Sequence, residues 1–156
     1  MNLSCFKAYD IRGRVPDELD ESLAYRIGRA YASFLHPARV VVGHDIRLSS
    51  PGMADAVARG LLDAGVDVFF LGECGTEEVY FAVFDQGLDG GIMVTASHNP
   101  KDYNGMKFVR EDSRPISGDT GLFAIRDMAA AEVFEAATGA GQLRPLNVRE
   151  RYRTIC

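Results

Sequence analysis

Cysteine is scarce in this chain, with three residues among 156, at positions 5, 74 and 156, and no C-x-x-C pair. An odd number of widely spaced cysteines argues against a disulfide framework or a zinc site and is typical of a reducing compartment. The N-terminus also lacks a basic stretch followed by an apolar one, so we expect no signal peptide. These observations predict a cytoplasmic protein.

Long apolar runs and blocks of like charge are also missing. No stretch approaches the ~20 apolar residues that a membrane-spanning helix needs. The formal net charge is −5, so neither nucleic acid nor an anionic membrane surface is an expected partner. The length of 156 residues and the 47% apolar content fit one domain with a normal core.

Three phosphate or nucleophile motifs are absent. There is no G-x-S-x-G, which weakens an α/β-hydrolase interpretation. There is no G-x-G-x-x-G after a strand and no G-x-x-x-x-G-K-[ST], so dinucleotide binding and a nucleotide phosphate cradle of that type are not expected.

Hydrophobic periodicity predicts strands that alternate with helices. Such alternation predicts an α/β, three-layer domain with a mixed, mostly parallel sheet of about four strands flanked by helices. Residues 1–140 would form this domain, and 141–156 a linker and the start of a further domain. The expected helices are 20–35, 50–64, one beginning at 76, and 121–134; the expected strands are 39–43, 66–71, 90–95 and 106–109.

Local signals predict how two of these elements begin. Ser50 would cap the second helix, with Pro51 at its first position. The pair Asn104-Gly105 is typical of a tight turn, after which 106–109 would return as an antiparallel strand.

Three loops are expected at the carboxyl ends of the parallel strands, where ligands gather in such sheets. They are residues 43–50, 72–76 and 96–103. The third contains Ser97, which the Asn99-Pro100 turn would hold on a stiff bend because proline restricts the residue before it. On residue types alone, an ordinary polar loop remains the competing interpretation.

Four motifs occur in order along the chain: Y-D-I-R-G at 9–13, G-H-D-I-R at 43–47, T-A-S-H-N-P at 95–100 and D-Y-N-G-M-K at 102–107. Together they resemble the first domain of the α-D-phosphohexomutases, especially the bacterial phosphomannomutase/phosphoglucomutase branch. The resemblance covers essentially the whole chain.

The resemblance implies one domain of a four-domain phosphomannomutase-type enzyme. Such an enzyme interconverts the 6-phosphate and the 1-phosphate of mannose or glucose through a hexose 1,6-bisphosphate. Ser97 would be the phosphoserine that carries the transferred phosphoryl group. His98, Lys107 and Arg12 would complete the catalytic residues of this domain. The substrate-binding residues would be Tyr9, Asn99 and Asn104.

A phosphoserine would carry roughly −1.5 to −2 charges, which a divalent cation, with Mg²⁺ the first choice, would offset. Ser97 would hold the metal through its phosphate. The remaining metal ligands, the sugar-selecting loop and the S-G-T phosphate motif of the family do not occur here and would belong to missing C-terminal domains. The isolated chain should therefore fold but show little or no mutase turnover.

Several residues have simpler interpretations. Arg12 could pair with Asp10 or Asp45, Lys107 could be an ordinary strand lysine, and His98 or Tyr9 could be structural. Asp45 and Arg47 are expected to serve the scaffold by pairing with each other or with nearby loops.

Other functions remain open at this point. A phosphoglucomutase or phosphoglucosamine mutase domain would contain the same kind of loop. A non-catalytic sugar-phosphate-binding module would keep the fold without the chemistry, and a hydrolase that uses Ser97 and His98 would be labelled by an acyl-serine trap.

Overall fold

The computed structural model describes residues 3–96, 99–137 and 139–146, in which strands and helices alternate. The strands are β1 (Ile11–Arg14), β2 (Arg39–His44), β3 (Asp67–Glu73), β4 (Gly90–Val94), β5 (Tyr103–Arg110) and β6 (Leu143–Pro145). The helices are α1 (Glu21–Leu35), α2 (Ser50–Asp63), α3 (Thr76–Gln86) and α4 (Phe123–Ala131), with short helical turns η1 (Glu111–Ser113) and η2 (Gly118–Leu122).

The six strands form one mixed sheet in the order β1-β5-β4-β2-β3-β6. Strands β4, β2, β3 and β6 run parallel to one another, whereas β5 runs antiparallel to both β4 and β1. The mixed, mostly parallel sheet is confirmed. The expected count of about four is exceeded by the two edge strands, β1 and β6, which are only four and three residues long.

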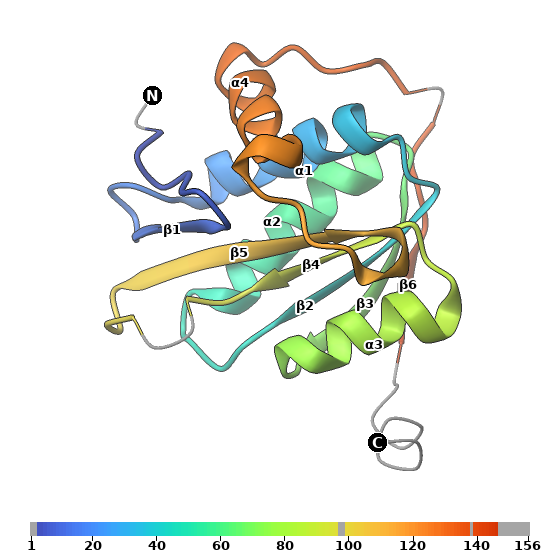
Figure 1. Ribbon diagram of the computed structural model, residues 1–156, viewed down its shortest axis with the longest axis horizontal. Coiled ribbons are helices and arrows are strands. Elements are labelled where there is room, and N and C mark those ends of the chain that lie inside the picture. Colours follow the sequence, from blue (N-terminus) through green and yellow to red (C-terminus); the bar gives the residue numbers. More distant parts are fainter. Residues whose placement is uncertain (1–2, 97–98, 138, 147–156) are drawn as a thin grey trace.

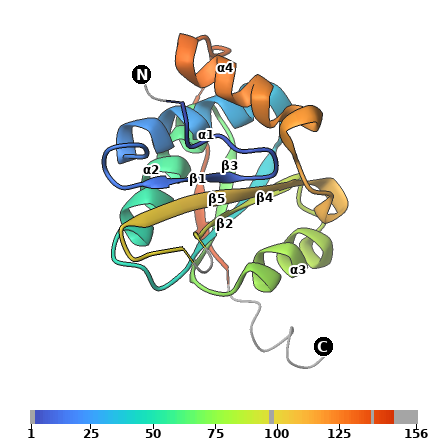
Figure 2. The same cartoon turned by 60° about the vertical axis from the view of Figure 1, so that its left-hand side comes forward.

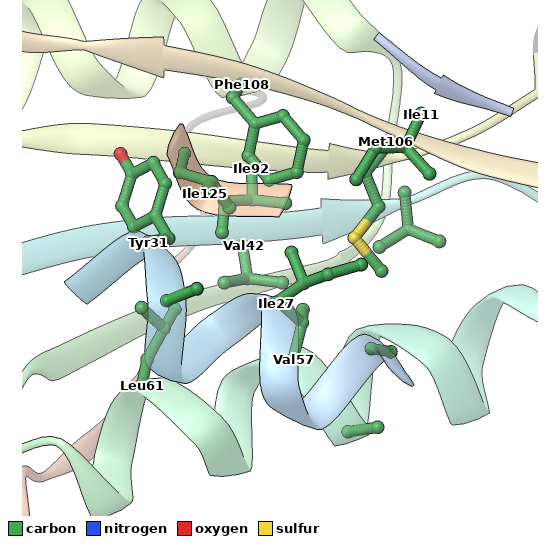
Figure 3. Close-up of a cluster of buried hydrophobic side chains, with 14 of the residues drawn as sticks. Ile11, Ile27, Tyr31, Val42, Val57, Leu61, Ile92, Met106, Phe108 and Ile125 are labelled. Carbon is green, nitrogen blue, oxygen red and sulfur yellow. The ribbon is translucent and has the colours of Figure 1, made fainter. Parts of the chain in front are cut away.

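Helices cover both faces of the sheet, as Figures 1 and 2 show. Helices α1 and α2 lie on one face and pack against each other, and α4 packs on α1; α3 lies alone on the opposite face. Because side chains alternate along a strand, each central strand supplies both cores. Val40 and Val42 contact the α1/α2 core and Val41 the α3 core; Figure 3 shows part of the larger one.

Helix α1 illustrates how the local sequence specifies an element. Asp20 accepts a hydrogen bond from the Leu23 amide at 2.8 Å, which satisfies a donor that the first turn leaves open. Leu23, Ile27 and Tyr31 then recur on the buried face. The predicted bounds of this helix are confirmed.

The start of α2 differs from the prediction. Its cap residue is Ser49, without a side-chain capping bond, so Ser50 is already helical and Pro51 occupies the second position. The Ser50 hydroxyl instead donates to the Asp45 carboxylate. The first residue of the helix therefore binds the preceding loop. This is a tertiary contact, which a local capping signal in the sequence does not reveal.

The prediction of a tight turn at Asn104-Gly105 is wrong. Both residues lie inside β5, and the chain reverses earlier, before Tyr103. Gly105 is needed for a different reason: a Cβ there would collide with the Ile11 carbonyl oxygen of β1 and lie 3.0 Å from the Thr95 carbonyl oxygen. The antiparallel return of this segment is confirmed.

The C-terminal part of the domain begins and ends differently from the expected helix 121–134. Residues Gly118–Leu122 form the wide turn η2, and the regular helix α4 ends at Ala131. Residues 143–145, within the expected linker, add β6 to the sheet edge beside β3. Among the described residues no helix is both long and apolar enough to cross a membrane.

Candidate functional site

The three loops expected at the carboxyl edge of the sheet do meet there. The Cys74 amide of the β3–α3 loop donates to the His44 carbonyl oxygen at 2.9 Å, and the Asp45 amide donates to the Val94 oxygen at the end of β4 at 3.0 Å. The β2–α2 loop therefore lies between the other two and contacts both.

Ser97 and His98 themselves lie outside the described residues, whereas the residues on either side of them are described. The Asn99 backbone amide donates to the Ala96 carbonyl oxygen at 3.1 Å, and the Asn99 side-chain amide donates to the same oxygen at 2.6 Å. These two bonds fix the distance between the residues that bracket Ser97 and His98. Asn99, an expected substrate-binding residue, is half-buried and uses its side chain for this local contact.

Arg47 contacts the far half of the same loop. One terminal nitrogen, Nη1, donates to the carbonyl oxygens of Pro100 at 2.7 Å and Tyr103 at 3.1 Å. The other, Nη2, donates to the Asn99 oxygen at 2.7 Å. Its side chain is only 14% exposed, so these carbonyl groups are satisfied by a group that is itself largely removed from water.

Asp45 contacts the near end of the loop. Its carboxylate accepts the Thr95 hydroxyl at 2.8 Å and the Arg47 backbone amide at 3.1 Å, and it also accepts the Ser50 hydroxyl. It forms an ion pair with Arg47 Nε at 3.4 Å. The expected pairing of Asp45 with Arg47 is confirmed.

A hollow of about 590 Å³ adjoins this arrangement. It is large enough for a small polar ligand. The residues that line it come from the two contacting loops: Asp45, Ile46, Arg47, Leu48, Thr95, Asn99 and Lys101.

Arg12 and Lys107 lie on the same face of the sheet, the face that α3 partly covers. Arg12 is paired with Gly105, and Lys107 lies two residues further along β5, opposite Met93 of the α3 core. Side chains at such diagonal positions have Cα atoms roughly 7–8 Å apart. Because the Thr95 amide donates to the Gly105 oxygen at 2.9 Å, the register also places Arg12 one strand away from the start of the serine loop.

The partners of these two cations differ. Arg12 Nε donates to Asp10 Oδ1 at 3.0 Å, the ion pair that the simpler interpretation expects, and its side chain is 45% exposed. The Lys107 side chain is half-buried and has no hydrogen bond or ion pair to another described residue. Burial, with the charges of Asp10 and Glu77 nearby, raises the pKa of the Tyr80 phenol in α3.

The other two expected substrate-binding residues occupy opposite environments. Tyr9 is 81% exposed just before β1. Asn104 is fully buried; its amide nitrogen donates to the hydroxyls of Ser49 at 2.7 Å and Ser50 at 3.0 Å, and its oxygen accepts the Gly105 amide at 2.8 Å. In this structure Asn104 joins β5 to the start of α2 and presents no surface to a ligand.

The described residues contain no group of three or more histidine, cysteine or acidic side chains that could hold a metal ion. What the sequence analysis missed is the extent of the Asp45 and Arg47 contacts. An aspartate and an arginine two positions apart, directly after a buried strand, were the available signal.

Comparison with known proteins shows which family the chain is related to. Residues 4–136 match the model of the family described as phosphoglucomutase/phosphomannomutase, alpha/beta/alpha domain I. The chain belongs to this family. The resemblance to this family and the α/β fold, both expected from the sequence, are thereby confirmed. The six-stranded α/β domain is the first domain of the phosphoglucomutase/phosphomannomutase family.

Individual relatives agree with that assignment. A phosphomannomutase of Salmonella montevideo is 57% identical over 153 residues, which are 97% of this chain and 34% of that protein. A phosphomannomutase sequence of Klebsiella pneumoniae is 57% identical over 152 residues, 96% of this chain and 97% of that sequence. The crystal structure of a phosphoglucomutase/phosphomannomutase family protein from Burkholderia thailandensis superimposes with a TM-score of 0.89 at 38% identity, covering 97% of this chain and 35% of that one. The chain thus spans about a third of the Salmonella and Burkholderia proteins.

Proposed function

We propose that this chain is the phosphoserine domain of a phosphomannomutase-type enzyme that interconverts hexose 6-phosphate and hexose 1-phosphate. The observation that supports the proposal most directly is the fastening of Thr95, Asn99 and Pro100, which flank Ser97 and His98 in the sequence, to the β2–α2 loop at the carboxyl edge of the sheet. The mutase chemistry needs a serine at this edge, where ligands gather in such sheets.

The reaction consists of two phosphoryl transfers. In the first, the bond between phosphorus and Ser97 Oγ breaks while a bond forms to the free hydroxyl oxygen of the sugar, whose proton passes to a base. The resulting hexose 1,6-bisphosphate turns around, and its other phosphoryl group returns to Ser97. Such transfers depend mainly on positioning and on neutralising charge.

The cationic side chains of this domain suit that requirement. The planar guanidinium of Arg12 can contact phosphate with two nitrogens at once, while its Nε stays on Asp10. Lys107, without an acidic partner in the described part of the chain, can hold phosphate or exchange the proton of the reacting hydroxyl. His98 would hydrogen-bond the phosphoserine or a substrate hydroxyl, and Tyr9 would contact the sugar from its exposed position.

A divalent cation, Mg²⁺, belongs to this proposal. When bound, it would neutralise charge on the phosphoryl oxygens. Ser97 would hold it through the phosphate. The described residues offer no further cluster of ligands, so the other ligands would come from the C-terminal domains that the family resemblance implies.

The proposal also includes the substrates and the cellular location of the enzyme. The substrates would be mannose or glucose phosphates with the corresponding 1,6-bisphosphate, and the C-terminal domains would complete the cleft. The few, widely spaced cysteines fit a cytoplasmic enzyme. The chain alone should show little or no mutase turnover.

Intact-mass measurement tests the proposal. The chain is incubated with a hexose 1,6-bisphosphate and Mg²⁺, and its mass is compared before and after. We expect one phosphoryl adduct, absent in Ser97→Ala and retained in the control Ser22→Ala, whose serine is exposed on α1. If the unsubstituted chain gains no adduct but still binds the bisphosphate, the chain is a non-catalytic sugar-phosphate-binding module and the enzyme proposal is wrong.

A further inference from the structure

We infer that Asp45 and Arg47, here termed the loop clamp, set the position of Ser97 for phosphoryl transfer. The two residues act as positioning residues, through the backbone of the serine loop and without touching the sugar. The inference rests on the proposed function, and it adds a structural cause for the reactivity of that serine.

The first step is the number and spread of the Arg47 contacts. Its two terminal nitrogens reach carbonyl oxygens of three residues, Asn99, Pro100 and Tyr103, at 2.7–3.1 Å. The Pro100 oxygen also accepts the Tyr103 backbone amide at 3.0 Å, and Arg47 adds a side-chain donor to this oxygen and to those of Asn99 and Tyr103. Arginine can do this because its five N–H groups point in fixed directions in one plane.

The second step is the opposite end of the loop. The Asp45 carboxylate accepts the Thr95 hydroxyl at 2.8 Å, and the Asp45 amide donates to the Val94 oxygen at 3.0 Å. Residues 94–95 and 99–103 are therefore both fastened to one three-residue segment, 45–47. Ser97 lies between the two fastened parts in the sequence.

The third step is the support of the clamp itself. The Asp45 and Arg47 side chains are only 20% and 14% exposed and lie within 3.4 Å of each other. Ser50 donates to Asp45 and in turn accepts from the buried Asn104 amide. The clamp thus continues into the fully buried end of β5, which limits its own movement.

The fourth step separates this role from phosphate binding. Each of the three guanidinium nitrogens of Arg47 faces a protein oxygen: Nε faces Asp45, Nη1 faces two carbonyls, and Nη2 faces a third. Arg12, in contrast, directs only Nε at a partner in the described residues. Arg12 is therefore the arginine suited to phosphate, and Arg47 the one suited to holding the loop.

The expected consequence is a change in rate. Misplacing a reacting group by about 1 Å can cost up to roughly 100-fold in rate. Without the clamp, phosphoryl transfer to Ser97 should slow about 10- to 100-fold. The bisphosphate concentration that gives half the maximal rate should change little, because the clamp does not touch the ligand.

The test compares Arg47→Ala, Arg47→Lys and Asp45→Asn with the matched control Arg59→Ala, which removes an exposed arginine from α2. Three quantities are measured on the 156-residue chain: the rate of adduct formation at several bisphosphate concentrations, backbone hydrogen exchange of residues 99–103, and the thermal unfolding midpoint. We expect slower transfer at saturation and faster exchange in all three clamp variants, and neither change in the control. Lysine should not restore the rate, because one ammonium cannot reach three carbonyl groups.

Several results would overturn the inference. Full activity in Arg47→Lys would mean that positive charge alone matters. A raised half-saturating concentration with unchanged maximal rate would place Arg47 on the ligand. If Arg47→Ala fails to fold, Arg47→Lys and Asp45→Asn decide the same question. If the unsubstituted chain gains no adduct, the proposed function fails by itself, and unchanged exchange at 99–103 in the clamp variants would then reject the clamp separately.

Discussion

The side-chain amide of Asn104 donates to the Ser50 hydroxyl at 3.0 Å, joining β5 to the first turn of α2 across 54 positions of sequence. Asn104 is fully buried and also bonds Ser49. Replacing it with alanine would leave both hydroxyls and the Gly105 amide without their present partner. We expect Asn104→Ala to lower the free energy of unfolding by about 1–3 kcal/mol.

Denaturant unfolding measures this change. Gln86→Ala is the matched control, because its side-chain amide is exposed at the end of α3, and it should change stability by less than about 0.5 kcal/mol. Equal effects of the two substitutions would contradict the structural role of Asn104.

Gly105 permits the close approach of three strands. A Cβ added at this position would meet the Ile11 carbonyl oxygen and come within 3.0 Å of the Thr95 carbonyl oxygen, both of them backbone atoms that cannot rotate away. Forcing such a contact into a packed sheet costs about 1–3 kcal/mol. We expect Gly105→Ala to destabilise the chain by at least that much, as measured by thermal or denaturant unfolding.

The comparison variant for this prediction is Gly139→Ala. An added Cβ there meets nothing within 4 Å, so this variant should have the same unfolding midpoint as the unsubstituted chain. A neutral Gly105→Ala would mean that β1 and β5 can separate at no cost.

Asn104 and Gly105 show which parts of the fold can be predicted from the sequence and which cannot. The long periodic elements α1 and β2–β5 were predictable because hydrophobic spacing is a local property of the chain. Asn104-Gly105 was misread because a local turn signal coincides with a tertiary requirement, namely a buried amide followed by a residue without a side chain. The edge strands β1 and β6 were missed because strands of three or four residues have too few positions to show alternation.

The candidate site divides in the same way. The loops at the carboxyl edge follow from the order of strands and helices, so their convergence was predictable. The shared face of Arg12 and Lys107 depends on the β1–β5 register, and the reach of Arg47 depends on the path of a distant loop. Neither can be derived from a single sequence.

Lys107 offers a direct functional prediction under the proposed mechanism. Its side chain is half-buried and without an acidic partner in the described ranges, so it can act on the reacting group. We expect Lys107→Ala to slow adduct formation at Ser97 by about 10²-fold or more, the low end of general acid–base contributions.

Intact-mass kinetics with hexose 1,6-bisphosphate measure this effect, with Lys7→Ala as a control that removes an exposed lysine near the N-terminus. Unfolding midpoints of both variants show whether the fold is retained. An unaltered rate in a folded Lys107→Ala would remove this lysine from the reacting centre.

Glu18 should make the stability of the domain depend on pH in the acid range. Its carboxylate accepts the Arg14 backbone amide at 2.8 Å and the Ser4 hydroxyl at 3.2 Å. The bond from the Arg14 amide is the main cause that lowers the pKa of Glu18 below its usual value of 4.5 in the folded chain. A carboxyl group with a lowered folded pKa stabilises the fold fully above its unfolded pKa, and this contribution disappears as the pH falls through the folded pKa.

We therefore expect Glu18→Gln to reduce stability at pH 7 and to have little effect well below the folded pKa, where Glu18 is already protonated. Urea midpoints of the two chains at a series of pH values should converge as the pH falls. Ser4→Ala, which removes the longer of the two hydrogen bonds to the same carboxylate, should change stability in the same direction by a smaller amount. Parallel curves for Glu18→Gln and the unsubstituted chain, with a constant gap at every pH, would show that the Glu18 charge does not contribute through these bonds.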